Sequence, residues 1–212
     1  MRDANHRQDR VIDVFADVSC PFAHFSLKRF VDERSRAGAG HVHLRVHAWP
    51  LELVNGHPLS VDAVADEIDD LRAQVADDLF IGFEASSFPE STIGIIGTAT
   101  LAYEHGMNIG EAFSLALRDA LFEQGKAIGR PDVLAAIAAD HGVTVADAAT
   151  ARTAAEADLA DGNTRGVVGS PYFIVDGHEF FCPTLDIQRR GEHLHIAIDH
   201  EAFSGFIERA LA

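Results

Sequence analysis

A cysteine marks the point where an apolar segment gives way to a helical pattern, and this junction constrains the fold more than any other feature. Residues 11–15 read Val-Ile-Asp-Val-Phe, a run of mostly β-branched and aromatic residues that predicts a buried strand. From Cys20 onward the apolar residues recur at helical spacing, and Pro21 suits a first helical turn because it has no N–H to lose. The sequence therefore predicts a strand, a short turn and a helix that begins at Cys20.

The start of a helix is a favourable place for a reactive thiol. The first backbone N–H groups of a helix have no partners within it, and the helix dipole is positive at this end, so a thiolate is stabilised there. We therefore predict that Cys20 is a nucleophile whose pKa lies at least one unit below roughly 8.5. The alternative is that Cys20 is a small buried residue under a helix, which is the more common fate of a free cysteine.

The remaining sequence places a long helical segment between two regions of strand. Residues 41–48 alternate apolar and polar side chains, which predicts a second strand. Residues 58–161 show mainly helical periodicity. Two apolar runs then flank Asp176-Gly177, the strongest short hairpin signal. We expect an α/β fold in which residues 10–57 and 162–212 form one domain and residues 58–161 form an inserted helical domain.

Composition and charge exclude several classes of function. The 212 residues include 17 Lys and Arg against 33 Asp and Glu, a net charge of −16, whereas a nucleic-acid partner requires a basic surface. No stretch approaches the length of a membrane span, and the N-terminal segment lacks the apolar run of a secretory signal. Two cysteines do not make a disulfide scaffold. We therefore expect a cytoplasmic protein with no nucleic-acid or membrane partner.

Two separated motifs give the chain a resemblance to a known superfamily. Cys20-Pro21 follows the first predicted strand, and Gly169-Ser170-Pro171 precedes the hairpin. In this order and context the chain resembles the DsbA-like branch of the thioredoxin superfamily, which includes FrnE-type oxidoreductases and the group of 2-hydroxychromene-2-carboxylate isomerases and kappa-class glutathione transferases. The resemblance covers nearly the whole chain. It implies a thioredoxin-like fold with an all-helical domain between the second and third strands, and a cis Ser170-Pro171 bond that faces Cys20.

The motif departs from the redox members of the superfamily at one position. Most of them carry Cys-X-X-Cys, in which the second thiol resolves the mixed disulfide formed by the first, whereas Ala23 stands at the second position here. If the two residues between the apolar runs form the hairpin turn, Cys182 lies opposite Pro171 and therefore near Cys20. Cys182 is thus a candidate resolving thiol. A buried strand-end cysteine without a role is an equally good interpretation.

Several other residues near Cys20 are candidates for the site. His24 lies four residues after Cys20, where it could bond a thiolate or transfer a proton, although a surface histidine without a role is the alternative. The histidines of the second strand do not predict a metal site, because His41 and His47 would lie roughly 20 Å apart. The candidate catalytic residues are Cys20, Cys182 and His24, and the candidate substrate-binding residues are Ser19, Pro21, Phe22, Ala23, Ser170, Pro171 and Trp49.

The resemblance implies an enzyme that acts on thiols. The first hypothesis is a thiol–disulfide oxidoreductase in which Cys20 attacks and either Cys182 or a low-molecular-weight thiol such as glutathione resolves the mixed disulfide. A thiol-cofactor-dependent isomerase or glutathione-transferase-like enzyme is one alternative, and a binding protein that lost the chemistry with its second cysteine is another. We expect no tightly bound cofactor. The expected partners are a small thiol, an apolar small molecule or a protein disulfide, with a homodimer as a candidate assembly.

Overall fold

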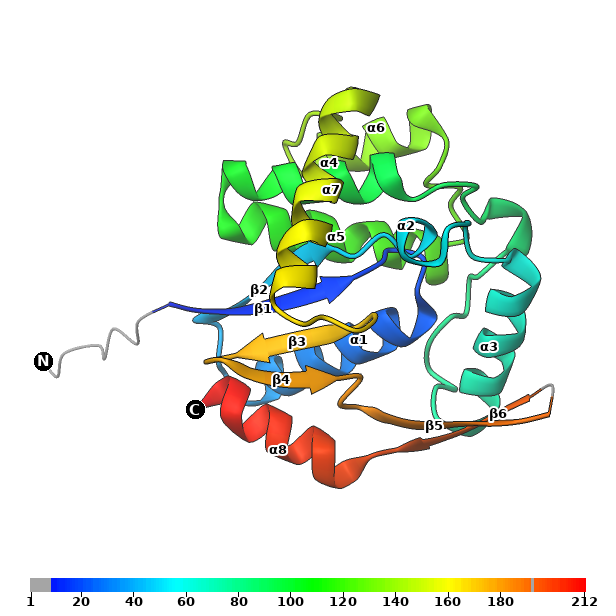
Figure 1. Cartoon of the computed structure of the whole chain (residues 1–212), viewed down its shortest axis with the longest axis vertical. Coiled ribbons are helices and arrows are strands. Elements are labelled where there is room, and N and C mark those ends of the chain that lie inside the picture. Colours follow the sequence, from blue (N-terminus) through cyan, green and yellow to red (C-terminus); the bar gives the residue numbers. More distant parts are fainter. Residues whose placement is uncertain (1–8, 192) are drawn as a thin grey trace, which may run out of the picture.

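A four-stranded sheet forms the centre of the fold (Figure 1). The computed structural model describes residues 9–191 and 193–212. From edge to edge, the sheet consists of β2 (Val42–Ala48), β1 (Arg10–Ala16), β3 (Tyr172–Val175) and β4 (His178–Phe181). β1 and β2 are parallel, whereas β3 is antiparallel to β1 and β4 is antiparallel to β3. This order places β1, the strand that leads into Cys20, inside the sheet.

Helices occupy the long segment between β2 and β3, as the sequence predicts. α1 (Pro21–Arg36) connects β1 to β2, and α8 (His200–Leu211) follows the last strand. The predicted α/β class, with an all-helical insertion between the second and third strands, is confirmed. None of the helices within the described residues is long and apolar enough to cross a lipid bilayer. The insertion contains α2 (Leu51–Asn55), α3 (Val61–Gln74), α4 (Ile93–Ala102), α5 (Met107–Phe122), α6 (Pro131–Asp140), α7 (Ala148–Thr164) and two short 3-10 turns at Ala85–Ser87 and Tyr103–His105.

Successive residues of β1 face two different layers, because side chains alternate along a strand. Ile12 and Val14 are buried in a cluster with apolar side chains of α1 and α8. Phe15 faces the opposite layer, where Gly162 of α7 lies so close that an added Cβ atom would come within 3.0 Å of the Phe15 ring. The sheet is therefore covered by α1 and α8 on one face and by α7 of the insertion on the other. The boundary predicted at residue 161 falls inside α7.

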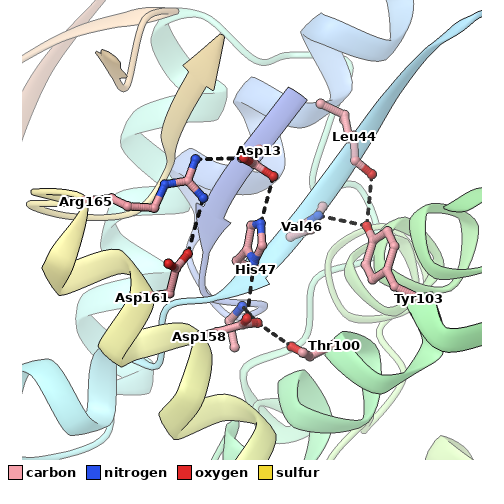
Figure 2. A network of polar contacts seen from close by, with 10 residues as sticks. Asp13, Leu44, Val46, His47, Thr100, Tyr103, Asp158, Asp161 and Arg165 are labelled. Atoms are coloured by element: carbon pink, nitrogen blue, oxygen red, sulfur yellow. Dashed lines mark hydrogen bonds and ion pairs between the residues drawn. The ribbon is translucent and has the colours of Figure 1, made fainter. Parts of the chain in front are cut away.

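The outer edge of β2 is covered by side chains of the insertion. The Val46 N–H donates to the Tyr103 hydroxyl (2.8 Å), and this hydroxyl donates to the Leu44 carbonyl (3.0 Å), as Figure 2 shows. The Leu44 N–H donates to the Glu111 carboxylate (3.1 Å). These contacts occupy backbone groups that would otherwise be free to pair with the strand of another chain.

A second, two-stranded sheet was not predicted from the sequence. β5 (Leu185–Arg190) and β6 (His193–Ile198) form a hairpin that extends beyond the main sheet and lies beside α3 (Figure 1). Side chains of α3 bond the outer edge of β6: Asp70 accepts from the Leu194 N–H (2.7 Å) and Gln74 from the Ile196 N–H (3.0 Å). The hairpin thus joins the C-terminal segment to the inserted domain.

Candidate functional site

The structure brings Cys20 and the Ser170-Pro171 segment together across 150 residues of sequence. Cys20 is the N-cap residue of α1, with extended backbone angles, and Pro21 occupies the first helical turn. The Cys20 thiol donates a hydrogen bond to the Ser170 carbonyl oxygen, with a sulfur–oxygen distance of 3.3 Å. The Ser170–Pro171 peptide bond is cis. The two motifs that carry the resemblance therefore meet at one point.

The surroundings of Cys20 favour the neutral thiol. Only 4% of the residue is exposed, and this burial raises the pKa of Cys20 to about 12. The Ser170 side chain and the Ala23 N–H act in the opposite direction, whereas the negative charges of Glu67 and Asp17 disfavour a thiolate. The predicted lowering of the Cys20 pKa is wrong for this conformation, because loss of hydration outweighs stabilisation by the helix start.

Asp17 organises the turn that carries Cys20. Its buried carboxylate accepts four hydrogen bonds: from the Ser19 N–H (2.9 Å) and hydroxyl (2.8 Å), the Leu51 N–H (2.8 Å) and the Thr92 hydroxyl (3.1 Å). The Asp17 N–H in turn donates to the Ser170 hydroxyl (3.0 Å). The Ser19 hydroxyl is therefore engaged by Asp17 rather than by the cysteine sulfur. Sequence reasoning missed Asp17, although an acidic residue directly after a buried strand is a usable signal.

A second buried charged side chain near the turn that carries Cys20 was also not predicted from the sequence. Arg118 of α5 is buried, and its guanidinium donates to the carbonyl (3.0 Å) and hydroxyl (2.9 Å) of Ser114 and to the Ala16 carbonyl (3.4 Å). No carboxylate of the described residues lies within ion-pair distance of it. Burial lowers the pKa of Arg118, and the negative charge of Asp17 is the main opposing influence. The Asp17 carboxylate thus stabilises the buried Arg118 guanidinium without a direct ion pair.

Cys182 lies where the hairpin geometry predicts. The register pairs Tyr172 with Phe181, and the next step outward places Pro171 opposite Cys182. The Cys182 N–H donates to the Pro171 carbonyl (3.0 Å). Cys182 has a φ of +43°, a left-handed conformation that favours glycine. The backbone at this position therefore holds the thiol beside the proline at some conformational cost.

Both cysteines are free thiols, and ionisation of Cys20 would raise the pKa of Cys182. Burial raises the pKa of Cys182 to about 12, and the charge of Cys20 is the next cause. Ser26 of α1 lies close to Cys182 and lowers its pKa, and the Ser26 hydroxyl lies 2.5 Å from that of Thr184. The two thiols therefore share one neighbourhood near the start of α1.

His24 points into the inserted domain rather than towards the cysteine sulfur. The side chain is 1% exposed and packs between the rings of Phe80 and Phe122. Its Nε2 lies 2.6 Å from the Glu123 carboxylate, which also accepts from the Phe80 N–H (2.9 Å). Burial lowers the pKa of His24, so the neutral ring donates its Nε2 proton to Glu123. His24 joins α1 to α5, and both the predicted bond to Cys20 and the surface alternative are wrong.

Acid should weaken the fold through His24. Because its pKa is lower in the folded protein than the ordinary 6.5, the stability is fully present above pH 6.5 and falls as the pH drops below it. The free energy of unfolding should decrease by up to about 1.4 kcal/mol per pH unit. In His24→Phe, which keeps a ring but cannot take a proton, urea titrations between pH 7 and 5 should show a shallower decrease. An unchanged slope would exclude this role.

The other predicted substrate-binding residues differ in their surroundings. Pro21 and Ala23 are buried in the first turn of α1, and Phe22 is half-buried against both main apolar clusters. Trp49 is buried in a separate small cluster with Phe15, Val167 and Tyr172. It therefore supports the sheet and offers no surface to a substrate in this conformation, contrary to the prediction.

Cys20 lines none of the four cavities described for residues 9–191 and 193–212. A cavity beside its turn, lined by Asp17, Ser19, Phe88 and Pro89, holds only about 10 Å³. Cavities of about 650 and 470 Å³ lie elsewhere, between α1 and α5 and between α1 and α8. A substrate must therefore displace covering side chains to reach the sulfur.

Comparisons with known proteins agree with the thioredoxin-like fold described above. The sequence profile of the DsbA-like thioredoxin domain matches residues 11–194. Solved structures with a similar fold include a 2-hydroxychromene-2-carboxylate isomerase and a probable DsbA oxidoreductase from Streptomyces coelicolor. The isomerase is 14% identical, with 81% of this chain and 88% of that chain covered and a TM-score of 0.59. The oxidoreductase is 18% identical, with 80% of this chain and 82% of that chain covered and a TM-score of 0.60. The cytosolic disulfide reductase DsbM from Pseudomonas aeruginosa, solved with GSH, is also similar. It is 18% identical, with 93% of this chain and 97% of that chain covered and a TM-score of 0.54.

A comparison with curated protein sequences found no significant match. The structural neighbours are too distant in sequence to show more than the fold. The sequence profile, however, covers most of the chain, including Cys20 and the Ser170-Pro171 segment. The chain therefore belongs to the DsbA-like thioredoxin domain family.

Proposed function

We propose that the protein is a thiol–disulfide oxidoreductase in which Cys20 forms a mixed disulfide with the substrate. The contact between the Cys20 sulfur and the Ser170 carbonyl carries this proposal, because it places the thiol beside the cis Ser170-Pro171 segment, along which we propose that a substrate docks. A peptide held along Ser170-Pro171 would bring its own sulfur to Cys20. Family membership supports thiol chemistry at this position.

The proposed reaction has two exchange steps. After Cys20 loses its proton, the thiolate attacks one sulfur of the substrate disulfide, the substrate S–S bond breaks, and the other substrate sulfur leaves as a thiolate. The Cys182 thiolate then attacks the Cys20 sulfur, which releases the remaining substrate thiol and leaves a Cys20–Cys182 disulfide. Two molecules of a small reduced thiol would restore both cysteines and leave as a disulfide.

Substrate docking must also activate Cys20, because burial holds it as a thiol at rest. Displacing the side chains that cover the sulfur would admit water and reduce the desolvation that raises its pKa. The Ala23 N–H at the start of α1, which already bonds the Cys20 sulfur, would then stabilise the thiolate. Cys182 must likewise lose its proton for the second step, since burial also holds it as a thiol.

Cys182→Ala should trap the mixed disulfide if Cys182 resolves Cys20. With oxidised glutathione, the variant should accumulate a glutathione adduct on Cys20, whereas the wild type should proceed to the internal disulfide. Mass spectrometry after acid quenching distinguishes the two, and Cys20→Ser is the control that should form neither product. If the adduct decays at the same rate in wild type and Cys182→Ala, an external thiol resolves it and Cys182 has no such role.

Glutathione or another low-molecular-weight thiol is the proposed reductant. DsbM, a structural neighbour, was solved with GSH, which supports a small thiol as co-substrate without showing that this chain binds one. The proposed substrate is a protein disulfide, and the proposed compartment is the reducing cytoplasm, in which free Cys20 and Cys182 would persist. The homodimer stays a prediction, which sedimentation velocity would test.

A thiol-cofactor-dependent isomerase or transferase is the second candidate. Ala23 favours it, because Cys20 has no partner thiol within the helix and could steer a bound thiol towards an apolar substrate. This candidate requires reduced glutathione or a related thiol to bind in the absence of any disulfide. Calorimetric titration with reduced glutathione would test it, and no detectable heat at millimolar ligand would count against it.

A further inference from the structure

A histidine on β2 is held between carboxylates from two different parts of the fold (Figure 2). His47 Nε2 lies 2.9 Å from Asp13 Oδ1 on β1, and His47 Nδ1 lies 3.2 Å from Asp158 Oδ1 on α7. A neutral imidazole has one N–H and one lone pair, so it can donate to only one of these carboxylates. The arrangement is therefore complete only when His47 carries both protons.

Asp158 extends the contact from the sheet to the inserted domain. Its second oxygen accepts from the Ala48 N–H (2.8 Å) and from the Thr100 hydroxyl of α4 (2.7 Å). On the other side of the ring, Asp13 accepts from Arg165 (2.7 Å), which lies directly after α7. The network thus ties β1 and β2 to α4 and to both the middle and the end of α7.

Packing around the ring excludes much of the solvent. Phe15 stacks on His47, with ring centroids 4.6 Å apart, and Gly162 of α7 allows close approach to Phe15 and Trp49. The side chains of His47 and Asp158 are 14% and 15% exposed. Charge interactions at such a site are screened less than those on an open surface.

Burial and the neighbouring charges have opposing effects on His47. Asp13 and Asp158 favour the imidazolium, whereas burial opposes it. Arg165 lies beyond Asp13, where it also bonds Asp161 (3.2 Å), and Arg118 lines a small cavity together with His47. The carboxylates prevail, and the pKa of His47 is raised to about 9 although burial alone would lower it.

We propose that protonated His47 is a pH-sensitive latch that fastens α7 of the inserted domain to the sheet that carries Cys20. When the imidazole loses its proton, one ring nitrogen presents a lone pair to a carboxylate, and one of the two bonds is lost. In the folded protein the latch is closed below about pH 9 and opens as the pH rises through that value. Its contribution to stability is fully present below the unfolded-state pKa of about 6.5 and is lost as the pH rises through about 9. The inference is independent of the reaction at Cys20.

The direct test is NMR titration of the His47 ring in the wild-type protein. The ring signals should move with a midpoint well above that of an ordinary histidine, near pH 9. In Asp158→Asn, which keeps the shape of the side chain but removes its charge, the midpoint should fall by about one unit. A wild-type midpoint at or below about 6.5, or an unchanged midpoint in Asp158→Asn, would overturn the proposal.

Unfolding equilibria test the same latch through stability. In the wild type, the unfolding constant should rise with pH by up to about tenfold per unit between about 6.5 and 9. His47→Asn should remove most of this rise, and His195→Asn, an exposed histidine on β6, is the matched control that should retain it. The latch is refuted if His47→Asn and His195→Asn show the same pH dependence.

Discussion

Replacing Cys20 with serine should reduce thiol–disulfide exchange to the uncatalysed rate, the largest change in activity expected of any single substitution. Serine keeps the size of the side chain and can donate to the Ser170 carbonyl as the thiol does. It cannot form a mixed disulfide, however, so the first exchange step has no nucleophile. Reduction of a glutathione mixed disulfide, followed with a coupled assay, would measure the loss.

Cys182→Ala is the matched control for this substitution. It removes the other buried thiol and leaves the Cys20 contact with Ser170 in place, so the first exchange step should persist. Circular dichroism should show that both variants are folded. Wild-type activity in folded Cys20→Ser would exclude Cys20 as the nucleophile.

Replacing Asp17 with alanine should cause the largest loss of stability among the substitutions considered. The change removes an acceptor of four hydrogen bonds and leaves buried donors of Ser19, Leu51 and Thr92 without partners. It also removes the main negative charge that balances the buried Arg118 guanidinium. We expect the free energy of unfolding to fall by about 4 kcal/mol, measured by urea titration at pH 7.

Asp147→Ala is a control that shows whether burial, rather than the number of hydrogen bonds lost, determines the loss of stability. Asp147 caps α7 and accepts three hydrogen bonds, two from backbone N–H groups and one from the Thr150 hydroxyl, but it is exposed. Water can replace the lost acceptor there, so the expected loss of stability is much smaller. Equal losses in Asp17→Ala and Asp147→Ala would show that Asp17 has no special role in holding the Cys20 turn.

Local patterns in the sequence predicted the parts of the site that local rules determine. The Asp176-Gly177 turn sets the register of β3 and β4, and a strand register has a period of two, so Cys182 opposite Pro171 followed directly. The apolar alternation of residues 41–48 likewise predicted which side chains of β2 are buried. The start of α1 directly after Cys20 was predicted from the position of Pro21 in the sequence.

Properties that depend on distant partners could not be predicted in this way. The pKa of Cys20 depends on the side chains that bury it and on Glu67 from α3, which no local pattern places there. His24 bonds Glu123, 99 residues away, and its distance from Cys20 in sequence gave no indication of that partner. The same applies to the β5–β6 hairpin, whose outer strand bonds to Asp70 and Gln74 of α3, more than 100 residues away in sequence.

The most direct test of the proposed function is to identify the residue that first bonds to a substrate sulfur. Wild-type protein would be mixed with a peptide that contains a disulfide, quenched with acid at increasing times, and analysed by mass spectrometry. We predict that the peptide is attached to Cys20 at the earliest times, and that a Cys20–Cys182 disulfide follows as the adduct decays. Attachment to Cys182 first, or reduction of the peptide while Cys20 never carries it, would contradict the assignment of Cys20 as the nucleophile.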